Sequence, residues 1–322
     1  MGQRTTPPHL PVMLGEVLEL FRPAGEKGGV LVDCTVGFGG HSEGLLERYP
    51  NLQIVGIDRD LEALEFSRQR LARFGERVRL LHGRASQLLP TLKKEPIVGV
   101  LADIGVSSYQ LDREERGFNF QSGVLDMRMD QTQSLSAYEV VNSYSREELG
   151  EVLKKYGEIK KPQPIVEKIV RSRPINSNRE LVQVLTQLGR KTPKSWAPIF
   201  QAIRIEVNRE LEELEQLLDA IEEVSRPEMV VGIITFHSLE DRIVKNRFRE
   251  WAKSCICPPD LFKCECGGDN SLGKILTKKP ITPTPAEVAR NPRARSAKLR
   301  GFLFERGADF RKRVGTNPKG SS

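Results

Sequence analysis

Short runs of branched apolar residues alternate with segments of helical spacing over the first third of the chain. The runs lie at residues 30–33, 54–58, 78–82 and 98–103, and a segment of helical spacing covers 61–74. Alternation of this kind predicts a parallel sheet flanked by helices. Runs that are apolar at consecutive positions suit strands buried on both faces. Three of the four runs end on an aspartate: Asp33, Asp58 and Asp103.

The pattern changes after residue 110. Helix signals then dominate to about 208: Ser145 and Glu148 have capping-box spacing before 146–156, and Asn178 can cap a helix at 179–188. Helix and strand signals alternate again at 210–224, 229–236, 239–251, 275–279 and 299–304. We therefore predict an α/β sheet of about seven strands, interrupted after the fourth. The predicted domains are 1–110 and 209–305 for the two parts of the sheet domain, 111–208 for a helical insertion and 306–322 for a basic flexible tail.

A glycine cluster follows the first apolar run; it contains Gly37, Gly39, Gly40 and His41. Such a loop at the carboxyl edge of a sheet serves dinucleotides as well as S-adenosyl-L-methionine. Ser42 at the third small position departs from the dinucleotide pattern, and the Asp33 carboxylate would repel a pyrophosphate but attract an amino group. Asp58 can accept hydrogen bonds from the ribose hydroxyls of either ligand. The loop alone leaves S-adenosyl-L-methionine, NAD or a ligand-free turn open, whereas acids ending strands one, two and four favour a class I methyltransferase.

Positive charge is concentrated near the carboxyl end. The net charge is +7, and the segment from Lys274 onward contains 13 Lys or Arg against 3 acids. Residues 311–322 have no apolar pattern, which is typical of a solvated tail. Residues 291–300 lead directly into a predicted strand, so we expect an ordered basic patch that contacts a phosphate backbone.

No apolar run approaches the roughly twenty residues of a membrane span, and the first residues lack the apolar core of a secretory signal. We expect a cytoplasmic protein without a membrane partner and without disulfides. Cys34 stands alone, and the other four cysteines form one group: Cys255, Cys257, Cys264 and Cys266. Four thiolates suffice for tetrahedral zinc, but C-x-C is less suited to chelation than C-x-x-C, so structural zinc and a metal-free loop both stay open. We expect no metal in the chemistry.

Several longer motifs resemble those of one family. They are His9-Leu-Pro-Val-Met-Leu-Gly-Glu-Val, Gly39-Gly-His-Ser, Gly56-Ile-Asp-Arg-Asp60, Asp103-Ile-Gly-Val-Ser-Ser-Tyr-Gln-Leu-Asp112, Glu115-Arg-Gly-Phe, Leu125-Asp-Met-Arg-Met-Asp130, Phe200-Gln-Ala-Ile-Arg-Ile, Phe236-His-Ser-Leu-Glu-Asp-Arg242 and Asn291-Pro-Arg-Ala-Arg-Ser-Ala-Lys-Leu-Arg300. Over residues 9–304 the chain resembles the bacterial ribosomal RNA small-subunit methyltransferase H family.

The resemblance implies an enzyme with a class I methyltransferase fold. Its implied activity is transfer of a methyl group from S-adenosyl-L-methionine to the exocyclic N4 of cytidine 1402 of 16S rRNA in the small ribosomal subunit. The helical insertion would then recognise the RNA. A noncatalytic RNA-binding or assembly factor that retains the cofactor fold is the alternative, and a homodimer is left open.

The resemblance also assigns site residues. The implied cofactor contacts are Gly39, Gly40, His41, Asp58, Asp103 and Gln110. Ala85 replaces an aromatic contact of the family, and residues 159–164 and 194–199 depart from its pattern in the insertion. These departures leave cofactor affinity and RNA recognition open.

The chemistry predicts an acceptor near the cytosine amine. Asp103 is the first candidate, with Ser107 in the turn behind it, and His237 after the fifth strand is a second proton acceptor. Each also has a structural interpretation, since Asp103 can orient the cofactor and His237 can be a structural hydrogen-bonding group. The chain lacks a D-P-P-Y type turn. The predicted RNA contacts are Arg293, Arg295, Lys298 and Arg300.

Overall fold

The computed structural model describes residues 11–257 and 263–310 and divides the chain into two compact units. The chain up to Gly105 and from Glu213 onward forms the first unit, and Val106–Glu212 forms the second. Each unit is described by itself. His9 of the first motif and residues 311–322 of the predicted tail 306–322 lie outside the described residues.

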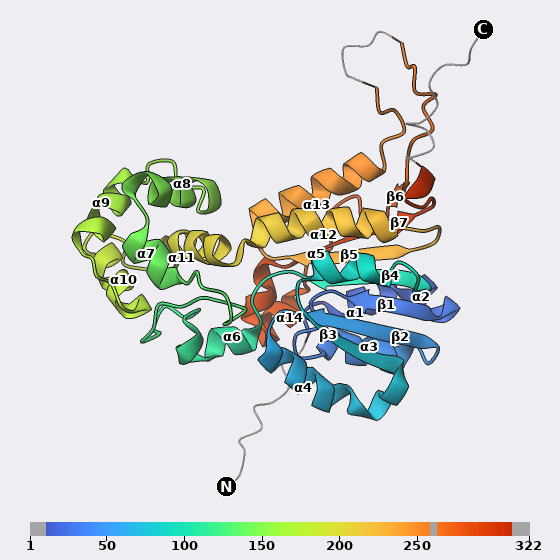
Figure 1. Cartoon of the computed structure of the whole chain (residues 1–322), viewed down its shortest axis with the longest axis horizontal. Helices are drawn as coiled ribbons and strands as arrows, with labels where there is room; N and C mark the ends of the chain where they lie inside the picture. The colour runs from blue at the N-terminus through green and yellow to red at the C-terminus, as the bar shows by residue number, and fades with distance from the viewer. Residues whose placement is uncertain (1–10, 258–262, 311–322) are drawn as a thin grey trace. The chain divides into compact units, whose positions relative to one another are not determined.

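The first unit is built on a seven-stranded sheet (Figure 1). The strands are β1 (Gly29–Asp33), β2 (Leu52–Asp58), β3 (Val78–His82), β4 (Ile97–Asp103), β5 (Val230–Thr235), β6 (Gly273–Ile275) and β7 (Lys298–Phe304). They are ordered β3-β2-β1-β4-β5-β7-β6, and β7 pairs antiparallel with both of its neighbours. The five strands from β3 to β5 in this order are parallel. This is the predicted class I methyltransferase sheet.

Successive residues of a strand face different cores. Val30 and Val32 of β1 pack in one buried cluster, while Leu31 packs in another. The first cluster is covered by α5, α12 and α13, and the second by α1, α3 and α4 (Figure 1). The helices of this unit are α1 (Leu14–Leu20), α2 (Arg22–Lys27), α3 (Gly40–Arg48), α4 (Leu61–Leu71), η1 (Ala72–Arg77), α5 (Ala85–Leu88), η2 (Leu89–Leu92), α12 (Glu210–Val224), α13 (Ser238–Trp251), α14 (Pro285–Arg290) and η4 (Pro292–Ser296).

The second unit is helical and has its own core. Its helices are α6 (Ser108–Asp112), η3 (Glu114–Arg116), α7 (Ala137–Ser143), α8 (Arg146–Tyr156), α9 (Gln163–Arg171), α10 (Asn178–Thr186) and α11 (Pro193–Asn208). Leu149, Ile169 and Ile203 are among the fully buried side chains of this core. The predicted capping box of Ser145 and Glu148 opens α8. That this unit recognises RNA stays a prediction.

Two sequence-based boundaries were wrong. Ser177, not Asn178, caps α10, because its side chain accepts the Glu180 backbone N–H. Asn178 is fully buried instead, and its Nδ2 donates to the Gly117 carbonyl at 2.8 Å. The predicted strand at 275–279 is β6 at Gly273–Ile275, because its ladder with β7 covers only these residues.

Among the described residues, no helix combines the length and the apolar character needed to cross a membrane.

Candidate active site

Three aspartates end neighbouring parallel strands: Asp33 on β1, Asp58 on β2 and Asp103 on β4. The carboxyl ends of parallel strands share one edge of a sheet, which is where ligands of open α/β sheets bind. β1 lies between β2 and β4, so the three carboxylates and the loop after β1 belong to one site.

The loop after β1 delivers the chain into α3. Gly37 and Gly39 have φ of 50° and 75°, the left-handed region that suits glycine. Gly39 is the N-cap of α3 and has no side chain to cap it. The first-turn N–H groups of a helix have no intrahelical acceptor, so this N-terminus offers donors for an anionic group such as a carboxylate.

Asp58 holds this loop in place. Its Oδ2 accepts the Gly37 N–H at 2.8 Å and its Oδ1 accepts the Asp60 N–H at 2.9 Å. Burial raises the pKa of Asp58, although these two hydrogen bonds oppose the shift. Each carboxylate oxygen retains acceptor capacity for a ligand hydroxyl.

Asp33 differs from the sequence-based expectation that it attracts a ligand amino group. Its side chain is buried and bonded within the protein: Oδ2 accepts the Ser42 hydroxyl at 2.6 Å and Oδ1 the Thr35 N–H at 3.3 Å. Burial raises the pKa of Asp33 to about 6, while the Ser42 hydrogen bond opposes the shift. Ser42 at the third small position therefore has a structural partner that links β1 to α3.

Asp103 is the least satisfied of the three carboxylates. The Asp103 N–H donates to Thr35 Oγ1 at 2.6 Å, which positions the end of β4 against the loop after β1. Its Oδ1 is buried and has no hydrogen-bond partner among the described residues. Burial, with a contribution from the charge of Glu240, raises the pKa of Asp103 to about 7. A buried acceptor without a partner indicates a place for a ligand donor or a positive charge.

His41 faces this carboxylate from the first turn of α3. Its Nε2 lies 2.8 Å from the Val12 carbonyl, which can only accept, so Nε2 carries the proton. Its Nδ1 lies 3.7 Å from Asp103 Oδ2. Burial lowers the pKa of His41, so the ring is neutral and adds no positive charge beside Asp103.

His237 lies at the end of β5 as predicted, where it is the N-cap of α13. Its Nδ1 accepts the Glu240 N–H at 3.5 Å, and its Nε2 lies 2.9 Å from Glu240 Oε1 without a well-directed hydrogen bond. Glu240 is fully buried and its Oε2 accepts the Phe236 N–H at 2.8 Å. We did not predict a role for Glu240, although its spacing from His237 is that of a capping box.

Ser107 and Gln110 lie in the second unit, where they form the capping box of α6. The Gln110 N–H donates to Ser107 Oγ at 3.1 Å, and the Ser107 N–H donates to Gln110 Oε1 at 3.0 Å. Both side chains therefore accept hydrogen bonds from backbone N–H groups of this cap. Their catalytic and cofactor roles stay predictions.

The basic patch divides into two parts. Arg293 and Arg295 are exposed on η4. Arg300 is only 7% exposed, and its Nε donates to Asp241 Oδ1 at 2.7 Å. Lys298 Nζ lies 3.4 Å from Asp241 Oδ2. This buried ion pair joins β7 to α13 and engages Arg300 within the protein, and contact of Arg300 and Lys298 with phosphate stays a prediction.

Ala85, where the family has an aromatic contact, is the first residue of α5 and is buried in the core.

The residues at the sheet edge fit S-adenosyl-L-methionine as the ligand. Backbone donors at the start of α3 suit its carboxylate, and Asp58 offers acceptors for its ribose hydroxyls. The unpartnered Asp103 Oδ1 suits a donor or a positive charge.

Comparison with known proteins places the chain among related sequences. The model of the MraW methylase family matches residues 6–305. The chain is similar to the ribosomal RNA small subunit methyltransferase H of Nautilia profundicola, with 56% identity over 301 residues that cover 93% of this chain and 98% of that protein. The proteins of the same name from Nitratiruptor sp. and Aliarcobacter butzleri are each 52% identical, covering 92% of this chain and 99% of theirs.

Proposed function

The chain belongs to the MraW methylase family, and from this premise we propose that it methylates the N4 amine of cytidine 1402 in 16S rRNA. The family and the names of the relatives support S-adenosyl-L-methionine as the cofactor and rRNA of the small ribosomal subunit as the substrate. The choice of base and of the N4 atom rests on the sequence resemblance and on the chemistry of the sheet edge.

One observation carries the proposal: Asp103 ends β4 with a buried oxygen that lacks a partner among the described residues. The N4 amine of cytosine is conjugated with the ring and is a poor nucleophile. A positioned acceptor that hydrogen-bonds to this amine fixes its direction and stabilises the positive charge that develops on it. Asp103 takes this role, and in its ionised form it then receives the amine proton.

The loop after β1 and the end of β2 hold the cofactor. When bound, S-adenosyl-L-methionine supplies a methyl group on a positively charged sulfur. The first-turn amides of α3, including those of Gly40 and His41, bind its carboxylate, and Asp58 binds its ribose. Neutral His41 adds no competing positive charge near Asp103.

The target base must leave its stack to reach a sheet edge. Arg293 and Arg295, exposed on η4, contact the phosphate backbone of the RNA. The helical unit Val106–Glu212 takes part in RNA recognition.

Radiolabelled methyl transfer tests this function. Small ribosomal subunits from cells lacking the protein, naked 16S rRNA and duplex DNA are each incubated with the protein and labelled S-adenosyl-L-methionine. We expect incorporation into the subunits, at cytidine 1402. Methylation of DNA would contradict the RNA substrate, and binding of the cofactor without transfer to any ribosomal particle would favour the noncatalytic alternative.

A further inference from the structure

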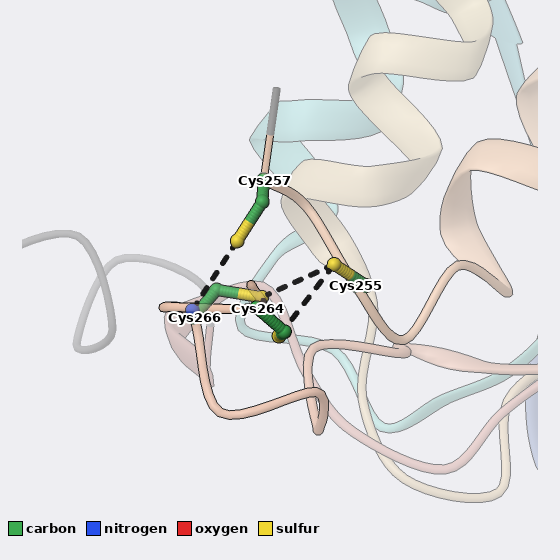
Figure 2. A group of neighbouring side chains, drawn as sticks. All are labelled: Cys255, Cys257, Cys264 and Cys266. Atoms are coloured by element: carbon green, nitrogen blue, oxygen red, sulfur yellow. Dashed lines mark hydrogen bonds between the residues drawn. The ribbon is translucent and has the colours of Figure 1, made fainter. Parts of the chain in front are cut away.

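The four cysteines predicted as a group meet in the loop between α13 and β6 (Figure 2). Cys255 and Cys257 follow the end of α13, and Cys264 and Cys266 precede β6. Their sulfur atoms all lie within 4.8 Å of one another. The cluster belongs to the first unit and contains none of the residues assigned to methyl transfer.

The sulfur positions have the spacing of a tetrahedral thiolate site. The Sγ atoms of Cys255, Cys264 and Cys266 form a triangle with sides of 3.7, 3.6 and 3.7 Å. Four sulfurs each about 2.3 Å from one zinc ion lie about 3.8 Å apart. A disulfide needs about 2.05 Å, so these contacts are not those of a covalent pair.

Backbone N–H groups point at the sulfurs from both halves of the loop. The Ile256 N–H donates to Cys266 Sγ at 3.3 Å. In return, the N–H groups of Glu265 and Cys266 donate to Cys257 Sγ, each at 3.3 Å. Hydrogen bonds of this kind stabilise thiolates and orient them toward a metal.

The described residues of this loop, 252–257 and 263–272, offer few other contacts near the cysteines. Ile256 is 46% exposed, so it adds little to a core. At the base of the loop, the buried Asn270 donates its N–H to the Ser254 carbonyl at 2.9 Å and its Nδ2 to the Cys266 carbonyl at 3.1 Å. These bonds fix the two ends of the loop, and the described residues beside the cysteines add no buried apolar side chain. A metal crosslink is the usual means by which a segment without a core is folded.

We propose that Cys255, Cys257, Cys264 and Cys266 bind one structural zinc ion that folds the loop between α13 and β6. Four thiolates make the site closed, so the ion has no open position for a substrate. An iron–sulfur cube is excluded by the spacing, since each thiolate would bind a different iron and the sulfurs would lie farther apart than 4.8 Å.

Elemental analysis of the full chain, purified without chelators, tests the site. We expect about one zinc per chain. Replacing zinc with Co²⁺ should give the visible absorption of tetrahedral cobalt with thiolate ligands, together with an intense sulfur-to-cobalt charge-transfer band. Cys264→Ser and Cys266→Ser should each lower zinc affinity at least tenfold and weaken the charge-transfer band.

Cys34→Ser is the matched control, because Cys34 is buried after β1 and is remote in sequence from the loop. It should retain the zinc content and the cobalt spectrum of the wild type. As a readout that needs no variant, removal of zinc from the wild type should accelerate amide exchange in Ile256, Glu265 and Cys266. The inference is overturned if wild-type protein with ZnCl₂ stays below about 0.1 zinc per chain and CoCl₂ gives no such bands. Retention of wild-type zinc affinity by both loop variants would overturn it equally.

Discussion

Asp103 is the residue whose surroundings matter most to the proposed chemistry. Burial raises its pKa to about 7, with Glu240 adding to the shift, so it changes charge near neutral pH. The Asp103 carboxyl can take up the amine proton only in its ionised form, and that form is populated as the pH rises through the pKa. Burial lowers the pKa of the neighbouring His41, so this ring does not supply a positive charge that would hold Asp103 ionised.

The kcat/KM of methyl transfer, which reports ionisation of the free enzyme, should therefore rise with pH through about 7, by about tenfold per unit on the acidic side. Asp103→Asn keeps the shape of the side chain but cannot ionise. It should lower the single-turnover rate by about 100-fold or more at pH 8 and abolish the rise in rate between acidic pH and pH 7, here called the acidic limb. Asp33→Asn is the control for the other carboxyl that titrates nearby, and it should keep the limb. A limb that survives in Asp103→Asn would contradict the assignment.

Asp33 should affect stability instead. Its pKa is raised from 3.8 to about 6 in the folded protein, mainly by burial. The folded state then holds the proton more tightly than the unfolded state, so this stabilisation is present below pH 3.8 and is lost as pH rises through about 6. From acid to neutral pH the loss is on the order of 3 kcal/mol. Urea unfolding of the wild type and Asp33→Asn at pH 4.5 and 7.5 measures this. The unfolding free energy of Asp33→Asn relative to that of the wild type should be higher at pH 7.5 than at pH 4.5. A relative stability that does not change with pH would contradict this assignment.

At this scale the sequence predicted the placement of acids after strands, and Asp58 and Asp103 lie there. It did not predict which acids are already bonded within the protein. The Ser42 partner of Asp33 and the Glu240 that acts on Asp103 both depend on side-chain positions in the folded state.

At the scale of elements, the pairing of β7 with α13 separates Arg300, which is held in an ion pair, from the exposed Arg293 and Arg295. Burial of Asp241 is the largest single influence and raises its pKa, but the hydrogen bond and charge of Arg300, with Lys298 adding to them, lower the pKa overall. Sequence alone cannot distinguish Arg300 from Arg295, because both belong to the same basic run. The difference in their surroundings is set by Asp241, which pairs with Arg300 and lies 59 residues from it in the sequence.

Charge reversal of Arg293 and Arg295 together should weaken binding to 16S rRNA and flatten its dependence on salt. Each lost phosphate contact lowers the slope of log affinity against log salt by about 0.7 to 0.9. Lys278→Glu with Lys279→Glu is the matched control, since both lysines are exposed and the net change in charge is the same. Fluorescence anisotropy at several salt concentrations measures the slopes. Equal slopes for the two double variants would show that η4 has no specific role.

At the scale of the whole molecule, the parallel part of the sheet and the interruption after β4 follow from patterns visible in the sequence. Alternation of apolar runs with helices predicted the parallel part, and loss of that rhythm predicted a helical insertion, which the structure has as the unit Val106–Glu212. The order of β6 and β7 was not predicted, because β6 has only three residues and its pairing is decided by contacts along β7. The choice of base lies beyond physical patterning and rests on the resemblance.

Mass spectrometry of the 16S rRNA fragment that contains cytidine 1402 tests the central claim most directly. The fragment is taken from cells that lack the protein and from the same cells supplied with the wild type or with Asp103→Asn. We predict that the N4-methyl group is absent without the protein, is restored by the wild type and is not restored by Asp103→Asn. An N4-methyl group that persists in cells without the protein would contradict the account.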